Sequence, residues 1–107
     1  MPVADDLSPL EKNTANTCSV LRSIGNPHRL SILCRLSHRE HSVTELVSVG
    51  SIGQSALSQH LARLRRDGLV MTRREAQTIY YSLKGSKIQI ILAALSKAMD
   101  QDTNTPG

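Results

Sequence analysis

Short amide and hydroxyl side chains recur between residues 54 and 59 of this sequence. They are Gln54, Ser55, Ser58 and Gln59, and the neighbouring His60 is expected to be half-buried. At about 100° per residue, Ser55 and Gln59 lie on the side of a helix opposite Leu57, Ser58 flanks them, and Gln54 lies in the first turn. Such groups near a helix N-terminus can reach base edges in the major groove of DNA, where Gln can pair bidentately with adenine. The alternative is the solvated polar face of an ordinary core helix, and the adjoining segments argue against it.

Arginines are concentrated directly after this polar face. Five fall within twelve residues, at positions 63, 65, 66, 73 and 74. Arg63 and Arg66 can reach phosphates from the same helix, whereas Arg73, Arg74 and Gln77 lie at the polar tip of a predicted hairpin, LVMTRREAQTIYYSL. A hairpin with arginines at its tip can lie along a DNA backbone or enter the minor groove. We therefore predict one nucleic-acid surface made by the helix and the hairpin, the alternative being a basic patch that only aids solubility.

The elements that must position these side chains are mainly helical. Start and stop signals, including Ser8-Pro9, Asn26-Pro27 and the capping-box pattern from Ser42 to Glu45, predict helices over residues 8–25, 26–37, 42–50, 53–67 and 86–99. The third and fourth are joined by the four-residue turn GSIG, the layout of a helix-turn-helix. The fold class predicted is therefore mainly α with a small β-hairpin, a winged helix-turn-helix.

Length and composition limit the chain to one small domain. It has 107 residues, no Trp, no Phe and two Tyr, so its core must be aliphatic, and such short chains often complete their apolar burial by oligomerising. The last predicted helix is apolar on two stripes, which favours a partner subunit against it. We expect flexible tails at 1–7 and 100–107 around a DNA-binding and dimerisation domain at 8–99. The net charge of +4 agrees mildly with an anionic partner.

Several classes of protein are disfavoured. No apolar run approaches the roughly 20 residues that span a bilayer, and the acidic N-terminus lacks the pattern of a signal peptide. We therefore expect a cytoplasmic protein that does not enter a membrane. No nucleophile–base–acid set, phosphate loop or cofactor motif is present, so neither enzymatic activity nor a cofactor is expected.

The segments QSALSQHLARLRRDGLV at 54–70 and TRREAQTIYYSL at 72–83 resemble the winged helix-turn-helix of the ArsR/SmtB family of bacterial transcriptional regulators, most closely its HlyU, NolR and BigR-like branch. EKN at 11–13, NPHRLSILCRL at 26–36 and SVTEL at 42–46 fit the same pattern. The resemblance implies a homodimer packed through its first and last helices, with two reading helices in successive major grooves of a pseudo-palindromic operator. By position, Gln54, Ser55, Ser58 and Gln59 match the groove-facing residues, and Arg73, Arg74 and Gln77 match the wing.

The sequence departs from the family where relatives bind metals. The thiolate pair of the metal-sensing members would fall at Ser42 and Thr44, and the last helix contains no histidine, so both inherited metal sites are absent. One non-standard set remains, because Cys34, His38 and His41 would share a face if the second helix continued that far. The residues favour instead an arrangement in which both histidines lie in the polar loop SHREHS.

Thiol chemistry is the other candidate signal. In the branch that the chain resembles, a cysteine at the position of Cys34 pairs with one in the last helix, which here reads SKIQIILAALSKAMD without a cysteine. Cys18 is the only other thiol. Arg35 and His38 are near enough in sequence to favour a thiolate at Cys34. The hypotheses are a reactive Cys34, alone or paired with Cys18, and an inert, half-buried thiol, with the sequence leaning towards the second.

These observations together predict a regulator of transcription that binds specific double-stranded DNA, as a repressor or as an anti-silencer that competes with another DNA-binding protein. Two alternatives stay open. One is a winged-helix module that binds proteins and not DNA. The other is a metal-responsive repressor that uses Cys34, His38 and His41.

Overall fold

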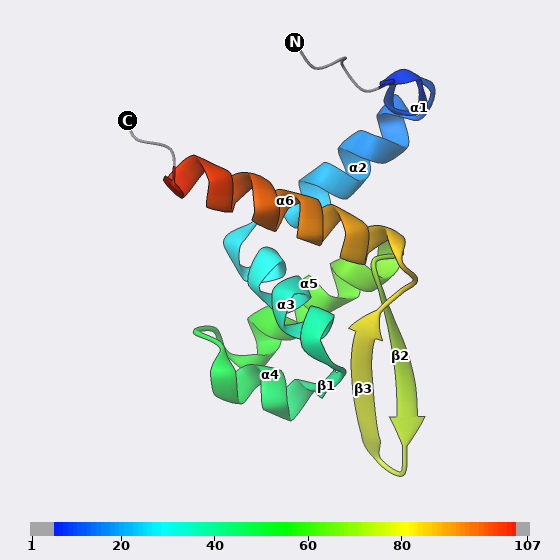
Figure 1. Ribbon diagram of the computed structural model, residues 1–107. Helices are drawn as coiled ribbons and strands as arrows, with labels where there is room; N and C mark the ends of the chain where they lie inside the picture. The colour runs from blue at the N-terminus through cyan, green and yellow to red at the C-terminus, as the bar shows by residue number, and fades with distance from the viewer. Residues whose placement is uncertain (1–5, 105–107) are drawn as a thin grey trace.

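The computed structural model describes residues 6–104, which fold into helices packed around a small sheet (Figure 1). In chain order the elements are α1 (Ser8–Lys12), α2 (Thr14–Ile24), α3 (Pro27–His38), β1 (His41–Ser42), α4 (Val43–Val49), α5 (Gln54–Arg66), β2 (Val70–Glu75), β3 (Thr78–Leu83) and α6 (Lys87–Asn104). Helices α3, α4 and α5 lie together, with the β2–β3 hairpin extending beside them. Helix α6 crosses above this group, and α1 and α2 rise away from it (Figure 1). The winged helix-turn-helix predicted from the sequence is confirmed.

The helix predicted over residues 8–25 is instead two helices, because Asn13 interrupts it. Asn13 has a non-helical backbone, with φ −122° and ψ 32°. Its side-chain amide donates a hydrogen bond of 2.7 Å to the carbonyl of Pro9. Short amide side chains compete with the helix for backbone groups in this way. The result is a bend between α1 and α2.

Asn26 and Ser42 cap the starts of two helices, as the sequence predicted. The Asn26 side chain accepts hydrogen bonds from the backbone N–H groups of His28 and Arg29, at 2.9 and 3.1 Å. Ser42 and Glu45 form the reciprocal capping box, with bonds of 3.2 and 3.1 Å. These caps satisfy backbone donors that a helix cannot satisfy itself.

The sheet contains a strand that the sequence did not predict. Strand β1 is only two residues long and pairs antiparallel with β3, placing β3 between β1 and β2. Two residues are too few to give a detectable alternation of apolar and polar side chains. The wing is therefore attached along one edge to the segment that precedes α4.

Helix α6 continues to Asn104, past the end expected near residue 99, so most of the predicted tail at 100–107 is helical. The segment DQDTN contains neither Gly nor Pro, and Pro106 is the first strong helix breaker. The tail predicted at 1–7 lies mostly outside the described residues.

The core is aliphatic, as the composition required. Its least exposed hydrophobic side chains come from α3, α5, β2 and α6, each at 1% exposure or less: Leu33, Leu61, Leu64, Val70 and Ile88. This core lies between α3, α5, the base of the wing and the start of α6, so it fixes α5 directly. Across residues 6–104, no helix has the length and apolar character needed to cross a bilayer.

Candidate nucleic-acid interface

Helix α5 has one buried side and one exposed polar side. Leu57, Leu61 and Leu64 recur at steps of four and three residues and are 2%, 0% and 0% exposed. They pack the helix against its neighbours α3 and α4 and against β2. All four predicted groove-facing residues, Gln54, Ser55, Ser58 and Gln59, are exposed. The structure thus presents them together on the N-terminal half of a rigidly packed helix.

The turn between α4 and α5 is fixed by contacts at the end of α4. Arg35 of α3 donates a hydrogen bond of 3.0 Å to the carbonyl of Val49. Gly50 closes α4 with a bond of 3.3 Å to the carbonyl of Val47, and Ile52 packs against the core. Gly53 stands at the N-cap of α5 without a side-chain cap. The start of the reading helix is therefore positioned by α3 and α4 and not by its own cap.

A buried arginine joins α5 to the two preceding helices, and no sequence signal pointed to it. Arg29 is 8% exposed, and its guanidinium donates to the carbonyls of Ser23 (2.6 Å) and Arg22 (3.1 Å) at the end of α2. A third N–H group lies 3.3 Å from Nδ1 of His60. Because arginine has no acceptor, the His60 nitrogen must accept this bond and carry no proton. Cationic Arg29 at the C-terminus of α2 also matches the helix dipole there.

His60 is half-buried, as predicted, and faces α3. Its ring centroid lies 5.6 Å from that of His28. Burial lowers the pKa of His60, and the charges of Arg29 and His28 lower it further. The neutral imidazole is therefore favoured, in agreement with its role as the acceptor for Arg29.

The arginines at the end of α5 surround one carboxylate. Nε of Arg63 lies 3.6 Å from one oxygen of Asp67, and Nε of Arg66 lies 3.7 Å from the other. The Arg66 side chain is nevertheless 72% exposed. Both arginines lie on α5, and their side chains are 37% and 72% exposed, so their terminal N–H groups can reach a phosphate beside the polar face of this helix. At 3.6 and 3.7 Å these contacts with Asp67 are too long for hydrogen bonds, so they orient the two arginine side chains but do not occupy their N–H groups.

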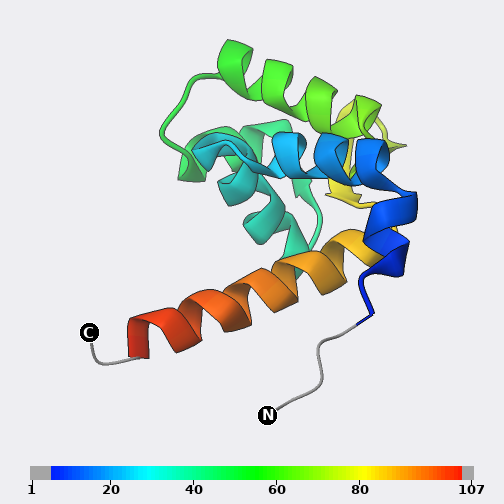
Figure 2. The ribbon, with the colours of Figure 1, turned by 90° about the horizontal axis from the view of Figure 1, so that it is seen from above.

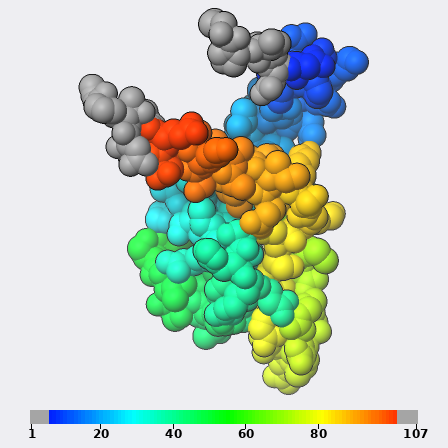
Figure 3. Space-filling view, in the orientation of Figure 1, coloured from blue at the N-terminus to red at the C-terminus, as the bar shows by residue number. Residues whose placement is uncertain are grey.

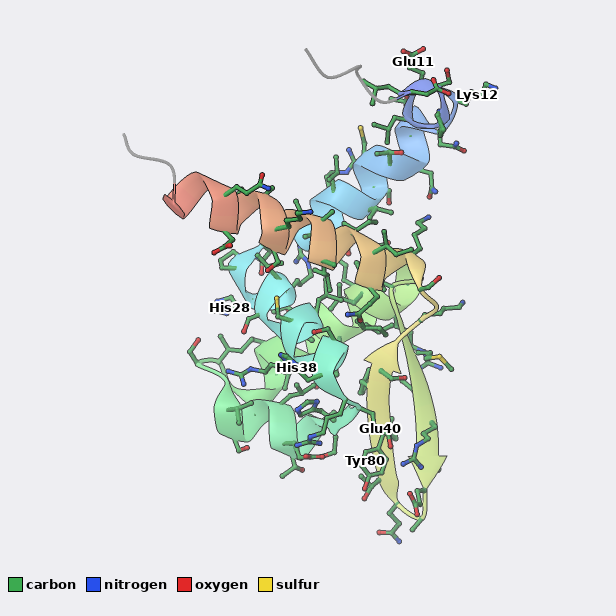
Figure 4. The ribbon with its side chains drawn as sticks, viewed as in Figure 1. Glu11, Lys12, His28, His38, Glu40 and Tyr80 are labelled. Atoms are coloured by element: carbon green, nitrogen blue, oxygen red, sulfur yellow. The ribbon has the colours of Figure 1, made fainter. Side chains whose placement is uncertain are left out.

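The two wing arginines have different environments. Arg73 donates hydrogen bonds to both oxygens of Glu40, with Nε to Oε2 at 2.8 Å, and a further one of 2.8 Å to Glu75. Its guanidinium carbon lies 4.5 Å from the ring centroid of Tyr80. Glu40 and Tyr80 lie close together at the wing in Figure 4. Among the residues that the structure describes, Arg74 finds no hydrogen-bond or ion-pair partner, and both Arg74 and Gln77 are exposed.

The hydrogen bonds from Arg73 lower the pKa of Glu40 below its ordinary value. The same bonds, together with those to Glu75, raise the pKa of Arg73. Each partner therefore keeps the other charged across the ordinary pH range.

The candidate signal residues are arranged differently from the expectation. Cys34 is exposed and not half-buried, and it and Cys18 are both free thiols. Helix α3 ends at His38, so it does not carry His41, which is buried in β1 with Nδ1 2.9 Å from the carbonyl of Arg39. Within the described part of the chain, no three His, Cys, Asp or Glu side chains are grouped so as to hold a metal ion. The structure gives the Cys34, His38 and His41 hypothesis no support.

A second surface, far from the reading face, is apolar. Figure 3 shows the α1–α2 arm projecting from the body of the domain, and Figure 2 shows α6 extending away from it. Large apolar side chains are exposed along them: Leu10 (51%), Leu21 (55%), Ile90 (65%), Leu95 (39%) and Met99 (58%). A hollow of about 600 Å³ lies between the arm and the start of α6. Leu10 and Leu21 line this hollow, and large exposed apolar side chains around such a hollow indicate an interaction site.

Comparison with known proteins agrees with this geometry. Residues 26–72 match the family described as bacterial regulatory protein, arsR family. The chain is 48% identical over 92 residues to the transcriptional activator HlyU of Vibrio cholerae, which covers 86% of this chain and 85% of HlyU. A solved structure of that HlyU gives a TM-score of 0.77 at 49% identity and covers 82% of this chain and 96% of its own.

Two further solved structures are similar. The transcriptional repressor BigR from Xylella fastidiosa gives a TM-score of 0.80 at 35% identity, over 88% of this chain and 96% of BigR. The homodimeric winged helix-turn-helix domain of Mb0332 from Mycobacterium bovis also gives 0.80, over 96% of this chain and 94% of its own. At 24% identity, the second comparison supports the fold alone.

Proposed function

The chain belongs to the ArsR family of bacterial regulatory proteins, and from this premise we propose that it acts as a homodimer whose two α5 helices read successive major grooves of a pseudo-palindromic operator. It is a DNA-binding transcriptional regulator and not an enzyme. We place its action in the cytoplasm, where it would meet the operator. The proposal depends above all on the exposed polar half of α5, whose opposite side is fully buried.

In this proposal the groove-facing residues and the arginines have separate tasks. Gln54, Ser55, Ser58 and Gln59 read base edges, with Gln59 and Gln54 suited to adenine. Arg63, Arg66, Arg74 and Gln77 contact the phosphate backbone, which supplies affinity and register without sequence information. Support comes from the exposure of all these residues except Arg63, which is partly exposed, on two adjoining elements.

The apolar surface along α1, α2 and α6 is the proposed dimer interface. A second copy would cover Leu10, Leu21, Ile90 and Leu95, which are 39–65% exposed in one chain. Isologous contact of this kind sets the spacing between the two reading helices. Sedimentation equilibrium should give the mass of two chains at micromolar concentration. A monomer under those conditions would contradict the dimer and leave single-site DNA binding to be tested.

The test of DNA binding begins with selection of duplexes from a random library, followed by affinity measurements over a range of salt concentrations. Gln59→Ala should cost about 1–3 kcal/mol on the selected duplex and relax the preference at one base pair of each half-site. Arg74→Ala should weaken binding to every sequence and lower the salt slope by about 0.9 for each phosphate that the variant no longer neutralises.

Lys12→Ala is the matched control once sedimentation equilibrium has shown that the variant is still a dimer, because it removes one positive charge from α1, at the opposite end of the molecule from the wing (Figure 4). It should leave both affinity and slope unchanged. If the wild type binds no duplex even at low salt, the protein-interaction module becomes the better account.

For the inducing signal we propose thiol chemistry at Cys34, since its exposure makes it accessible to oxidants and persulfides. Wild type and Cys34→Ser would be compared for DNA affinity, each reduced and each treated with peroxide or persulfide. A response confined to the wild type supports the proposal. Equal responses would remove Cys34 from the mechanism, and the same comparison on Cys18→Ser tests a two-thiol version.

A further inference from the structure

The outer half of the wing has no buried anchor. Residues 73–79 are all exposed, whereas Val70 at the base of β2 is 1% exposed. Strand β3 pairs with β1 over only two residues, through His41 with Tyr81 and Ser42 with Tyr80. A two-stranded ribbon of this length is only marginally stable without such support. Core packing therefore fixes the base of the wing, and surface contacts are what can hold its outer half.

Arg73 and Glu40 make a contact that spans the sheet. In the β2–β3 register Arg73 lies opposite Tyr80, and Tyr80 in turn lies opposite Ser42 of β1. The Arg73 side chain crosses the ring of Tyr80 at 4.5 Å and reaches Glu40, which precedes β1. It meets both carboxylate oxygens there, so the pairing is bidentate. The edge strand β2 is thereby tied across β3 to the end of the segment that follows α3.

The charges around Arg73 do not favour a phosphate. Glu40 and Glu75 both accept from its guanidinium, so two carboxylates oppose one positive charge. A phosphate oxygen approaching this group would be repelled and would have to displace a carboxylate. Arg74 is the next residue of the strand, so its side chain is on the opposite face of the ribbon, and the described residues offer it no carboxylate.

We propose that Arg73 and Glu40 are positioning residues for the wing, and that their pairing across Tyr80 aims Arg74 and Gln77 at the duplex without touching DNA. This inference rests on the proposed function and revises the assignment of Arg73 as a DNA contact. An exposed ion pair contributes little to the stability of a fold. The pair acts on the direction of the hairpin, and its loss should appear in DNA affinity and not in unfolding.

The test is a double-mutant cycle on the full chain with Glu40→Gln, Arg73→Gln and the double variant, measured on a selected duplex at several salt concentrations. Each single change should weaken binding by about three- to thirtyfold, within the range of coupling between residues in contact. The double variant should bind no more weakly than either single one. Because both single variants disturb the contact of Arg74 with its phosphate, Glu40→Gln and Arg73→Gln should lower the salt slope to the same extent, and neither by more than the control Arg74→Gln, which lowers it by about 0.9 for each phosphate left without its cation.

If Arg73 instead contacts a phosphate, the DNA affinity of Glu40→Gln should rise and not fall. If Arg73 binds a phosphate, Glu40→Gln frees the guanidinium and removes a negative charge, so binding becomes tighter. That result, or a salt slope that falls in Arg73→Gln but not in Glu40→Gln, would overturn the inference. Arg73→Lys adds a second criterion, because lysine keeps the charge but lacks the planar fork. Wild-type affinity in Arg73→Lys would also count against a positioning role.

Two controls separate the other ways in which the inference can fail. Thermal unfolding of Glu40→Gln and Arg73→Gln should match the wild type, and a lowered midpoint would mean that the pair supports the fold and not the wing angle. Absence of duplex binding by the wild type itself would refute the proposed function and this inference with it. A wild type that binds while Glu40→Gln binds more tightly refutes the inference alone.

Discussion

Helix α5 and the β2–β3 wing contribute to the same candidate DNA surface, yet they are held in place by different kinds of contact. The helix is fixed by three leucines at 0–2% exposure and by the link from buried Arg29 to His60. The wing is buried only at its base, and its outer half is held by Arg73, Glu40 and Tyr80 at the surface. The orientation of the reading helix is thus inseparable from folding, whereas that of the wing can change while the domain remains folded.

The largest effect expected from this difference is on folding stability. Leu64→Ala removes a side chain that is 0% exposed and leaves a cavity, so the free energy of unfolding should fall by about 2.7–5 kcal/mol. This loss can be measured by urea unfolding. The chain concentration must be kept constant, because the unfolding of a dimer depends on concentration.

The matched change in the wing is Ile79→Ala, on β3 near the tip. Ile79 is 38% exposed, so its truncation should change the free energy of unfolding by no more than about 0.5 kcal/mol. Similar losses for the two variants would show that the wing is part of the folding core, and the contrast between the two regions would then be wrong.

A smaller effect should appear when the pH is lowered. The pKa of His60 is lowered in the fold, so at pH above about 6.5 the residue is neutral in both folded and unfolded chains. Below that pH the unfolded chain takes up a proton that the folded chain resists. Stability should therefore fall as the pH drops from about 6.5 to the folded pKa, and then level off. The groups that oppose the proton are Arg29 and His28 of α3.

His60→Asn tests this link, because the amide oxygen can accept from Arg29 without titrating. Urea unfolding between about pH 7.5 and pH 5 should show a weaker pH dependence than in the wild type. An unchanged pH dependence in His60→Asn would contradict the role given to His60.

The ion pair between Arg73 and Glu40 in the wing is sensitive to pH in a lower range. Glu40 has its pKa lowered from 4.5, so the negative charge that pairs with Arg73 is present above that value and is lost as the pH falls through the folded pKa.

The same contrast explains what the sequence could predict. The step of Leu57, Leu61 and Leu64, the cap at Asn26 and the box at Ser42 are local patterns, and each predicted its helix correctly. The break at Asn13 and the two residues of β1 were missed because one depends on a side-chain bond back to Pro9 and the other on pairing with a distant strand. Local patterns report local structure only.

The contacts that position the interface are long-range, and for that reason they could not be predicted. Arg29 meets His60 across 31 positions, and Arg73 meets Glu40 across 33. Periodicity and capping carry no information at such separations. The exposed residues of α5 were predicted because burial of the opposite side follows from the sequence. The pairing of Arg73 was not, since both wing arginines look alike in the motif TRRE.

The smallest effect expected is at the wing tip, where Ala76 has φ 55°. This left-handed conformation costs a residue with a Cβ about 1–2 kcal/mol, and replacement by glycine removes that cost. Glycine, however, loses more conformational entropy on folding than alanine does, so only part of the gain remains. Ala76→Gly should therefore raise the free energy of unfolding by about 0.5 kcal/mol. Ala62→Gly is the control, since Ala62 is exposed in the interior of α5, where the same change should lower stability by about 1 kcal/mol. If Ala76→Gly raises the free energy of unfolding while Ala62→Gly lowers it, then backbone conformation, and not side-chain packing, determines the stability of the wing tip. A loss at both positions would mean that the methyl group of Ala76 has packing value, so that the wing is held by more than the surface contacts of Arg73.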